Sequence, residues 1–232
     1  FRRQRQMCIR DSSNWSNIFI AHIRRDILTN SRSLLDLISI VGFMILIIIL
    51  FPLGLGPIKE KLNIVSNAVI WVGLILAIIP SLEKLLQKDF ESGWLDQIAT
   101  SPAPLEIIML SKAISYWLIM LIPLIITSPI FAILLDMDLK NIPWLVISIS
   151  AGSLAISLIG LSGSALILGA RRGNILLPIL IIPLMTPILI FGVGVNEAVK
   201  INESPFGNLF LLLALTLISV SYTHLTLPTK VS

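Results

Sequence analysis

The feature of this chain that most limits its fold is a series of long apolar segments, each with at most one charged residue. The first, residues 34–55, holds Asp36 as its single charge. A bilayer core takes roughly 20 apolar residues per helix, and backbone groups in lipid must be hydrogen-bonded within the structure. Strands of a membrane barrel alternate apolar and polar residues, whereas these segments are continuously apolar. The pattern predicts an all-α membrane protein.

The composition leaves little chain for anything outside the membrane. Hydrophobic residues make up 56% and charged residues 13% of the 232 positions, against about 45–50% and about 25% in soluble domains. We therefore expect a single transmembrane domain, residues 13–220, with six helices and short loops, and this excludes a soluble enzyme domain. The predicted spans are 34–55, 65–82, 107–135, 142–168, 175–195 and 206–220 onward.

The two ends of the chain lack this pattern. Residues 1–12 have no clear periodicity, and a polar tail from Ser221 breaks the sixth span after about 15 residues, too few to cross. We interpret 1–12 and 221–232 as candidate non-native ends. On that interpretation Cys8 and His224 say nothing about function.

The distribution of Lys and Arg predicts the orientation. Seven arginines precede Ser33, and further basic residues fall in the second–third and fourth–fifth connections, whereas the opposite loops hold few. Cytoplasmic loops carry the excess of basic residues, so we expect both termini in the cytoplasm. We attribute the net charge of +4 to this bias, and expect no nucleic-acid partner. The basic residues of the two connections are Lys84, Lys88, Lys112, Arg171 and Arg172; the opposite ones are Lys59, Lys61, Lys140 and Lys200.

The segment before the first span has helical periodicity. Its apolar residues recur at near-helical spacing, with Arg24, Arg25 and Asp26 between them. This favours an amphipathic helix at the cytoplasmic interface over a solvated leader. The apolar stripe consists of Trp15, Ile18, Phe19, His22, Ile23, Ile27 and Leu28.

The sequence offers no active site of its own. It has no nucleotide-binding glycine loop, and its single Cys and two His support neither a catalytic triad nor a metal site. We therefore predict no catalytic residue, no metal and no directly bound cofactor. Asp36 and Glu197 lie near span ends, where they can reach water. We interpret the prolines of the third and fifth spans as kinks that shape packing rather than as broken helices.

The connection of residues 83–104 is the most informative stretch, because it mixes charges with Phe90, Trp94, Leu95 and Ile98. Gly93 can end a helix there, and prolines turn the chain back to the membrane. A short amphipathic helix would present an apolar edge to a soluble partner. Anchoring of the aromatic rings at the lipid interface explains the same residues, and charge and aromaticity do not separate the two readings.

Four groups of motifs occur together in this chain. They are Asp89-Phe90-Glu91-Ser92-Gly93-Trp94-Leu95-Asp96-Gln97, Ser101-Pro102-Ala103-Pro104-Leu105 with Ser111-Lys112, Leu50-Phe51-Pro52-Leu53-Gly54, and Leu168-Gly169 with Arg171-Arg172-Gly173. Together they resemble the family of haem exporter protein B (CcmB), a membrane subunit in cytochrome c maturation. The resemblance covers about residues 18–220 and departs from the family pattern at 221–232.

The resemblance implies an ABC-exporter-type permease in the bacterial inner membrane, or in the mitochondrial one if the chain is organellar. It implies a separate ATPase subunit (CcmA), membrane partners CcmC and CcmD, and the haem chaperone CcmE as an indirect partner. ATP would act through the partner, and haem would be a cargo rather than a cofactor. On this basis we predict a coupling loop that docks on the ATPase, formed by Asp89, Phe90, Glu91, Gly93, Trp94 and Leu95.

Two alternatives stay open at this point. One is a scaffold that moves nothing and transmits motion to a haem-handling subunit. The other is an exporter permease for a different hydrophobic substrate, because exporter permeases share architecture without sharing cargo.

Overall fold

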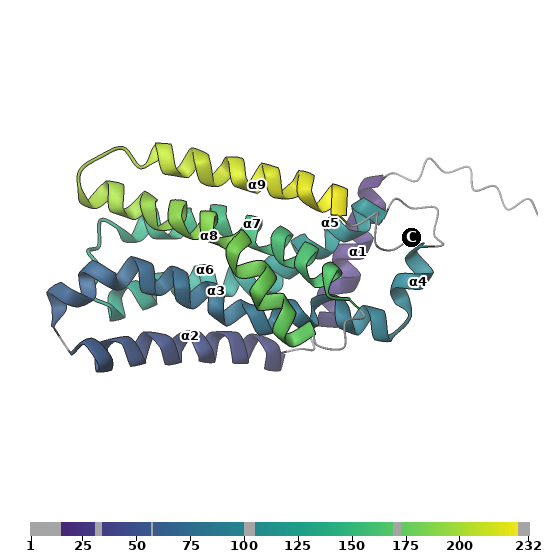
Figure 1. Cartoon of the computed structure of the whole chain (residues 1–232), viewed down its shortest axis with the longest axis horizontal. Helices are drawn as coiled ribbons and strands as arrows, with labels where there is room; N and C mark the ends of the chain where they lie inside the picture. The colour runs from purple at the N-terminus through teal and green to yellow at the C-terminus, as the bar shows by residue number, and fades with distance from the viewer. Residues whose placement is uncertain (1–14, 31–33, 57, 100–104, 169–172, 227–232) are drawn as a thin grey trace, which may run out of the picture.

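The computed structural model describes residues 15–30, 34–56, 58–99, 105–168 and 173–226, and every regular element among them is a helix. Figure 1 shows the long helices side by side along one axis, with α1 and α4 at one end. We call this the basic end. The elements are α1 (Trp15–Asn30), α2 (Leu34–Leu55), α3 (Lys59–Glu91), α4 (Trp94–Ala99), α5 (Leu105–Tyr116), a π-helical turn η1 (Trp117–Leu121), α6 (Ile122–Leu134), α7 (Ile142–Leu166), α8 (Gly173–Lys200) and α9 (Phe206–Thr226).

The predicted membrane class is confirmed. Five described stretches are helical, long and apolar enough to cross a bilayer, and a sixth, Phe206–Ser221, is apolar but shorter. This apolar stretch ends where the sequence predicts that the polar tail breaks the span, while the helix α9 continues to Thr226. Ser, Tyr, Thr and His are only mildly unfavourable in a helix, so a polar tail can stay helical.

The helix α3 is much longer than the span predicted at 65–82. The first part of the second–third connection, up to Glu91, continues it, because most of these residues, such as Glu83 and Lys84, are good helix formers. The third predicted span is one helical rod interrupted by η1. Pro123 lacks the N–H that would bond back to Ile119, so a wider π turn before it is a local solution to that break.

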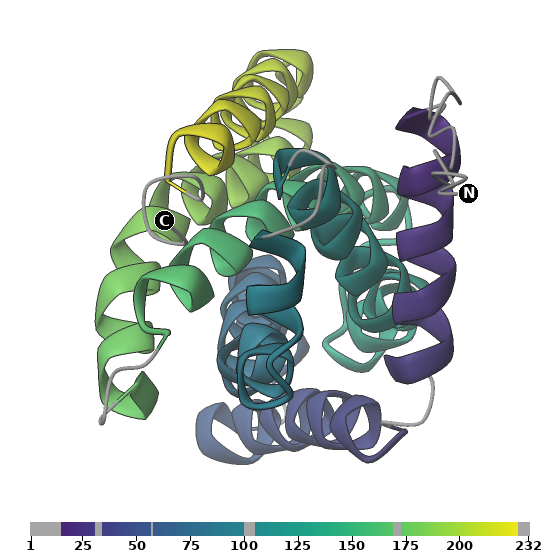
Figure 2. The same ribbon diagram turned by 90° about the vertical axis from the view of Figure 1, so that its right-hand side faces the viewer.

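The helix α1 lies across the end of the bundle rather than along it (Figure 2). It packs against α5, as expected of an interfacial helix that precedes the first span. One detail of the prediction is wrong. Asp26 was placed on the polar side of α1, but it is 2% exposed and faces the protein.

The core lies where α7 packs against α3, α8 and α9. Trp71 of α3 is fully buried there. A Cβ atom on Gly152 of α7 would lie 2.6 Å from the Trp71 ring, and one on Gly192 of α8 would lie 2.3 Å from it. The ring therefore fits only because both neighbouring helices carry glycine. α8 contains Pro178, Pro183 and Pro187 within the helix, and Figure 1 shows it bending, in agreement with kinks rather than breaks.

Candidate functional site

A turn at the basic end joins α3 to α4, and we call residues 89–95 the α3–α4 elbow. Gly93 has φ +69, a left-handed conformation that glycine adopts without steric cost. The Gly93 N–H donates to the Phe90 carbonyl (3.1 Å), and the Ser92 hydroxyl donates to the Asp89 carbonyl (3.0 Å). These bonds cap α3, and α4 starts directly afterwards at Trp94.

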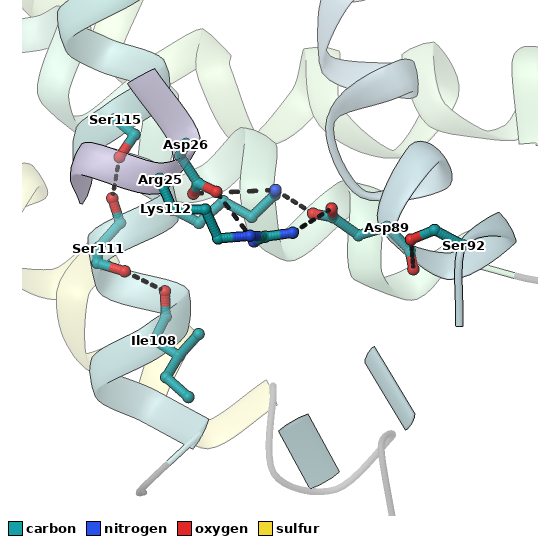
Figure 3. Close-up of polar contacts among 8 residues, drawn as sticks. All are labelled: Arg25, Asp26, Asp89, Ser92, Ile108, Ser111, Lys112 and Ser115. Carbon is teal, nitrogen blue, oxygen red and sulfur yellow. Dashed lines mark hydrogen bonds and ion pairs between the residues drawn. The ribbon is translucent and has the colours of Figure 1, made fainter. Parts of the chain in front are cut away.

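The inner side of the elbow meets a buried lysine. Lys112 of α5 is only 4% exposed. Its ammonium donates to the Asp89 carboxylate and lies 4.0 Å from the Asp26 carboxylate of α1 (Figure 3). One cation therefore connects three helices, α1, α3 and α5.

Arg25 completes this group. Its guanidinium lies 3.2 Å from the Asp26 carboxylate and 3.8 Å from that of Asp89. It also stacks on the Trp94 ring, 3.8 Å from the ring centroid, a contact worth about 0.5–2 kcal/mol. We call Arg25, Asp26, Asp89 and Lys112 the ion cluster. It contains two positive and two negative charges. Balance matters because an unpaired charge in this position would be strongly unfavourable.

Burial shifts the titration of two groups on α1. Burial raises the pKa of the Asp26 carboxyl above its ordinary value of 3.8, while Lys112 and Arg25 act in the opposite direction. Burial lowers the pKa of His22 below 6.5; Asp26 opposes this and Arg25 adds to it. The His22 ring lies 6.0 Å from the Trp94 ring, edge to face. A neutral His22 therefore suits this contact with α4.

The elbow divides the six residues predicted as a coupling loop into two sets and a hinge. Asp89, Trp94 and Leu95 face inward, with Leu95 only 3% exposed. Phe90 is 48% exposed, and Glu91 is exposed beside Gln87, which donates to it at 2.9 Å. Gly93 makes the turn between them. Among the six, Phe90 and Glu91 are the side chains that the elbow turns outward to a partner.

Asp26 and Lys112 are site residues that the sequence pattern alone does not predict. Lys112 was counted among the loop charges, although it is the only charge in the apolar stretch 107–135. That isolation is the signal that could have identified it, because an ionisable group inside an apolar helix needs a partner.

A second ionic contact lies near the ion cluster, where Lys84 and Lys88 donate to Asp36 at 3.1 and 3.2 Å. Among the described residues, no three His, Cys, Asp or Glu side chains are grouped to hold a metal.

These observations define a multi-pass helical membrane protein whose basic end carries an exposed turn fixed to the bundle by buried charges. The sequence model of the CcmB protein family matches residues 17–231. The chain therefore belongs to the CcmB family, whose members are non-catalytic membrane subunits.

The curated relatives agree with the family match over most of the chain. Heme exporter protein B of Pseudomonas aeruginosa is 36% identical over 208 residues, covering 90% of this chain and 93% of the relative. The protein of the same name from Haemophilus influenzae is 37% identical over 191 residues, covering 82% and 86%. That of Escherichia coli K12 is 32% identical over 173 residues, covering 75% and 79%.

Proposed function

We propose that this protein is the membrane permease subunit of an ABC-type haem export complex that serves the biogenesis of c-type cytochromes. A separate ATPase subunit, CcmA, hydrolyses ATP, and the cycle releases the haem-loaded chaperone CcmE. CcmC and CcmD are the membrane partners. The relatives named Heme exporter protein B, similar over most of their length, support the haem assignment.

The observation that carries the coupling step is the two-sided elbow. Its outer side offers Phe90 and Glu91 at the end of a helix that runs on through the bundle as α3. Its inner side is held by Lys112 and Arg25. A force applied to the outer side is thereby transferred both to α3 and, through the ion cluster, to α1 and α5. An exposed aromatic ring on such a turn is a suitable anchor for a groove in a soluble subunit.

The test is co-purification of the ATPase subunit with a Phe90→Ala/Glu91→Ala variant. Both side chains are exposed, so the membrane subunit should insert and fold normally. We expect the ATPase subunit to be lost from the complex and cytochrome c maturation to fall with it. A matched control is Leu139→Ala/Glu203→Ala, which removes one exposed apolar and one exposed acidic side chain from the opposite end. Equal ATPase recovery in both variants, with normal maturation, would reject the elbow as the docking point.

The proposed orientation puts the basic end in the cytoplasm of a bacterial inner membrane. In a Cys8→Ser background, Glu91→Cys should react with a membrane-impermeant thiol reagent only after cell lysis. Glu203→Cys, at the opposite end, should react in intact cells. The reverse pattern would invert the topology.

A scaffold without transport activity is a second candidate, favoured by the packing around Trp71. The ring fills the contact of α3 with α7 and α8, in the middle of the bundle. Reconstituted complex in lipid vesicles separates the two functions. ATP-dependent movement of haem across the vesicle membrane would reject the scaffold, whereas CcmE release without haem movement would support it.

A further inference from the structure

A groove between α2 and α3 runs from the basic end towards the middle of the bundle. Its upper part, about 380 Å³ of space partly open to solvent, is lined by Lys84, Lys88, Lys112, Ser81 and Tyr116, with the carboxylates of Asp36 and Asp89 among them. Its lower part, about 450 Å³, is lined by Ile40, Phe43, Ala77 and Pro80. Asp36, Ser81 and Lys84 line both parts, so the two parts are adjacent.

The groove is polar at its top and apolar below, and it opens sideways. Phe43 is 44% exposed, and Ser39 and Pro80 are also exposed. In a membrane protein, that side is where lipid lies.

A buried hydroxyl pair lines the upper part. The Tyr116 hydroxyl is buried, with the Ser81 hydroxyl as its polar neighbour. Both side chains line the groove, where the Tyr116 O–H can rotate to donate to an acceptor oxygen that enters from the α2–α3 side.

We propose that this groove binds one anionic phospholipid, with the phosphate between Lys84, Lys88 and the Tyr116 hydroxyl and one acyl chain along Phe43, Ala77 and Pro80. The charge arrangement favours an anion. Lys84 and Lys88 share a single carboxylate, Asp36, which leaves one positive charge in excess. Each ammonium has three donors and uses one here on Asp36, and both side chains are more than half exposed. Basic pockets between membrane helices are established binding sites for anionic headgroups.

The test is native mass spectrometry of the protein released from bilayers containing equal amounts of phosphatidylglycerol and phosphatidylcholine. We expect one phosphatidylglycerol to be retained in preference to phosphatidylcholine. Lys84→Gln/Lys88→Gln should lower that retention roughly tenfold or more, and Tyr116→Phe should lower it by less without changing the packing. Because the first variant leaves Asp36 unpaired, Lys84→Gln/Lys88→Gln/Asp36→Asn repeats the test with the charge balanced.

The matched control is Lys61→Gln/Lys140→Gln, which removes two exposed lysines at the opposite end and should leave retention unchanged. Equal retention of the two lipids by the native protein, or retention unaffected by any groove variant, would overturn the proposal. Displacement of the lipid by millimolar glycerol phosphate would also overturn it, since that result would indicate a site for free phosphate rather than for a lipid. The proposal does not rest on the transport function, so a failed ATPase test leaves it standing.

Discussion

At the residue scale, the unusual feature of this protein is that its buried charges occur as a set. Asp26 and Lys112 are almost inaccessible, and each would be costly alone. Removing one member of a buried pair generally costs about 3–5 kcal/mol, because its partner is left charged without compensation. The ion cluster is therefore a condition for docking α1 and the elbow on the bundle.

We predict that Lys112→Met destabilises the protein by about 3–5 kcal/mol, measured by thermal unfolding in detergent. The reason is that Asp26 and Asp89 would then face each other with only Arg25 between them. Lys112→Met/Asp26→Asn should recover part of the loss. Lys84→Gln, whose side chain is 57% exposed, should cost at most about 1 kcal/mol. A Lys112→Met variant as stable as the native protein would show that the cluster carries no stability.

The lowered pKa of His22 predicts a pH dependence. Below 6.5 the unfolded state binds a proton at His22 that the folded state resists, so stability is lost as the pH falls below 6.5 towards the lowered folded value. The raised pKa of Asp26 acts oppositely, because stability is lost as the pH rises above 3.8. When the pH is lowered from 7 to 5, the free energy of unfolding of His22→Gln should therefore fall by less than that of the native protein. Parallel curves for the two proteins would contradict this prediction.

At the scale of elements, the elbow decides what the long helix α3 can do. The left-handed Gly93 separates the inward residues from the outward ones, and a residue with a Cβ atom costs roughly 1–2 kcal/mol in that conformation. We predict that Gly93→Ala raises hydrogen exchange in residues 89–98 and weakens ATPase co-purification. Gly93→Asn should have a smaller effect, because Asn tolerates this conformation better. Unchanged hydrogen exchange in Gly93→Ala would mean that a side chain at position 93 does not strain the turn.

Most elements could be predicted from their sequences, and their ends could not. The apolar stretches 34–55, 142–168 and 175–195 each correspond to a helix, because hydropathy is a local property. The predicted apolar span ends at residue 82, and Gly93 is where the sequence predicts that a helix in the following connection can end. In the structure residues 83–91 leave the apolar stretch but stay helical, so that they continue α3 up to Glu91. Polarity and helix propensity are independent quantities, so the end of an apolar span does not mark the end of a helix.

At the scale of the whole molecule, the bundle is organised around α7, with Trp71 of α3 as its largest buried side chain. We predict that Gly192→Ala destabilises the bundle by roughly 1–3 kcal/mol, because the new methyl group would overlap the Trp71 ring. Gly42→Ala is the control, since nothing lies within 4 Å of its Cβ position, and removing a helical glycine should be neutral or stabilising. Equal unfolding temperatures for both variants would show that the Trp71 ring can shift to make room for the methyl group without a loss of stability.

The sequence by itself determined the membrane class, the helical character, the interfacial helix and the position of the turn at Gly93, because these follow from periodicity, hydropathy and glycine within short windows. Only the tertiary structure decided that Asp26 and Lys112 are buried together and that Asp89 and Trp94 face inward while Phe90 and Glu91 face outward. The physical reason is that a charge can be buried only where an opposite charge meets it. For Lys112 the opposite charges come from two other helices, far away in the chain.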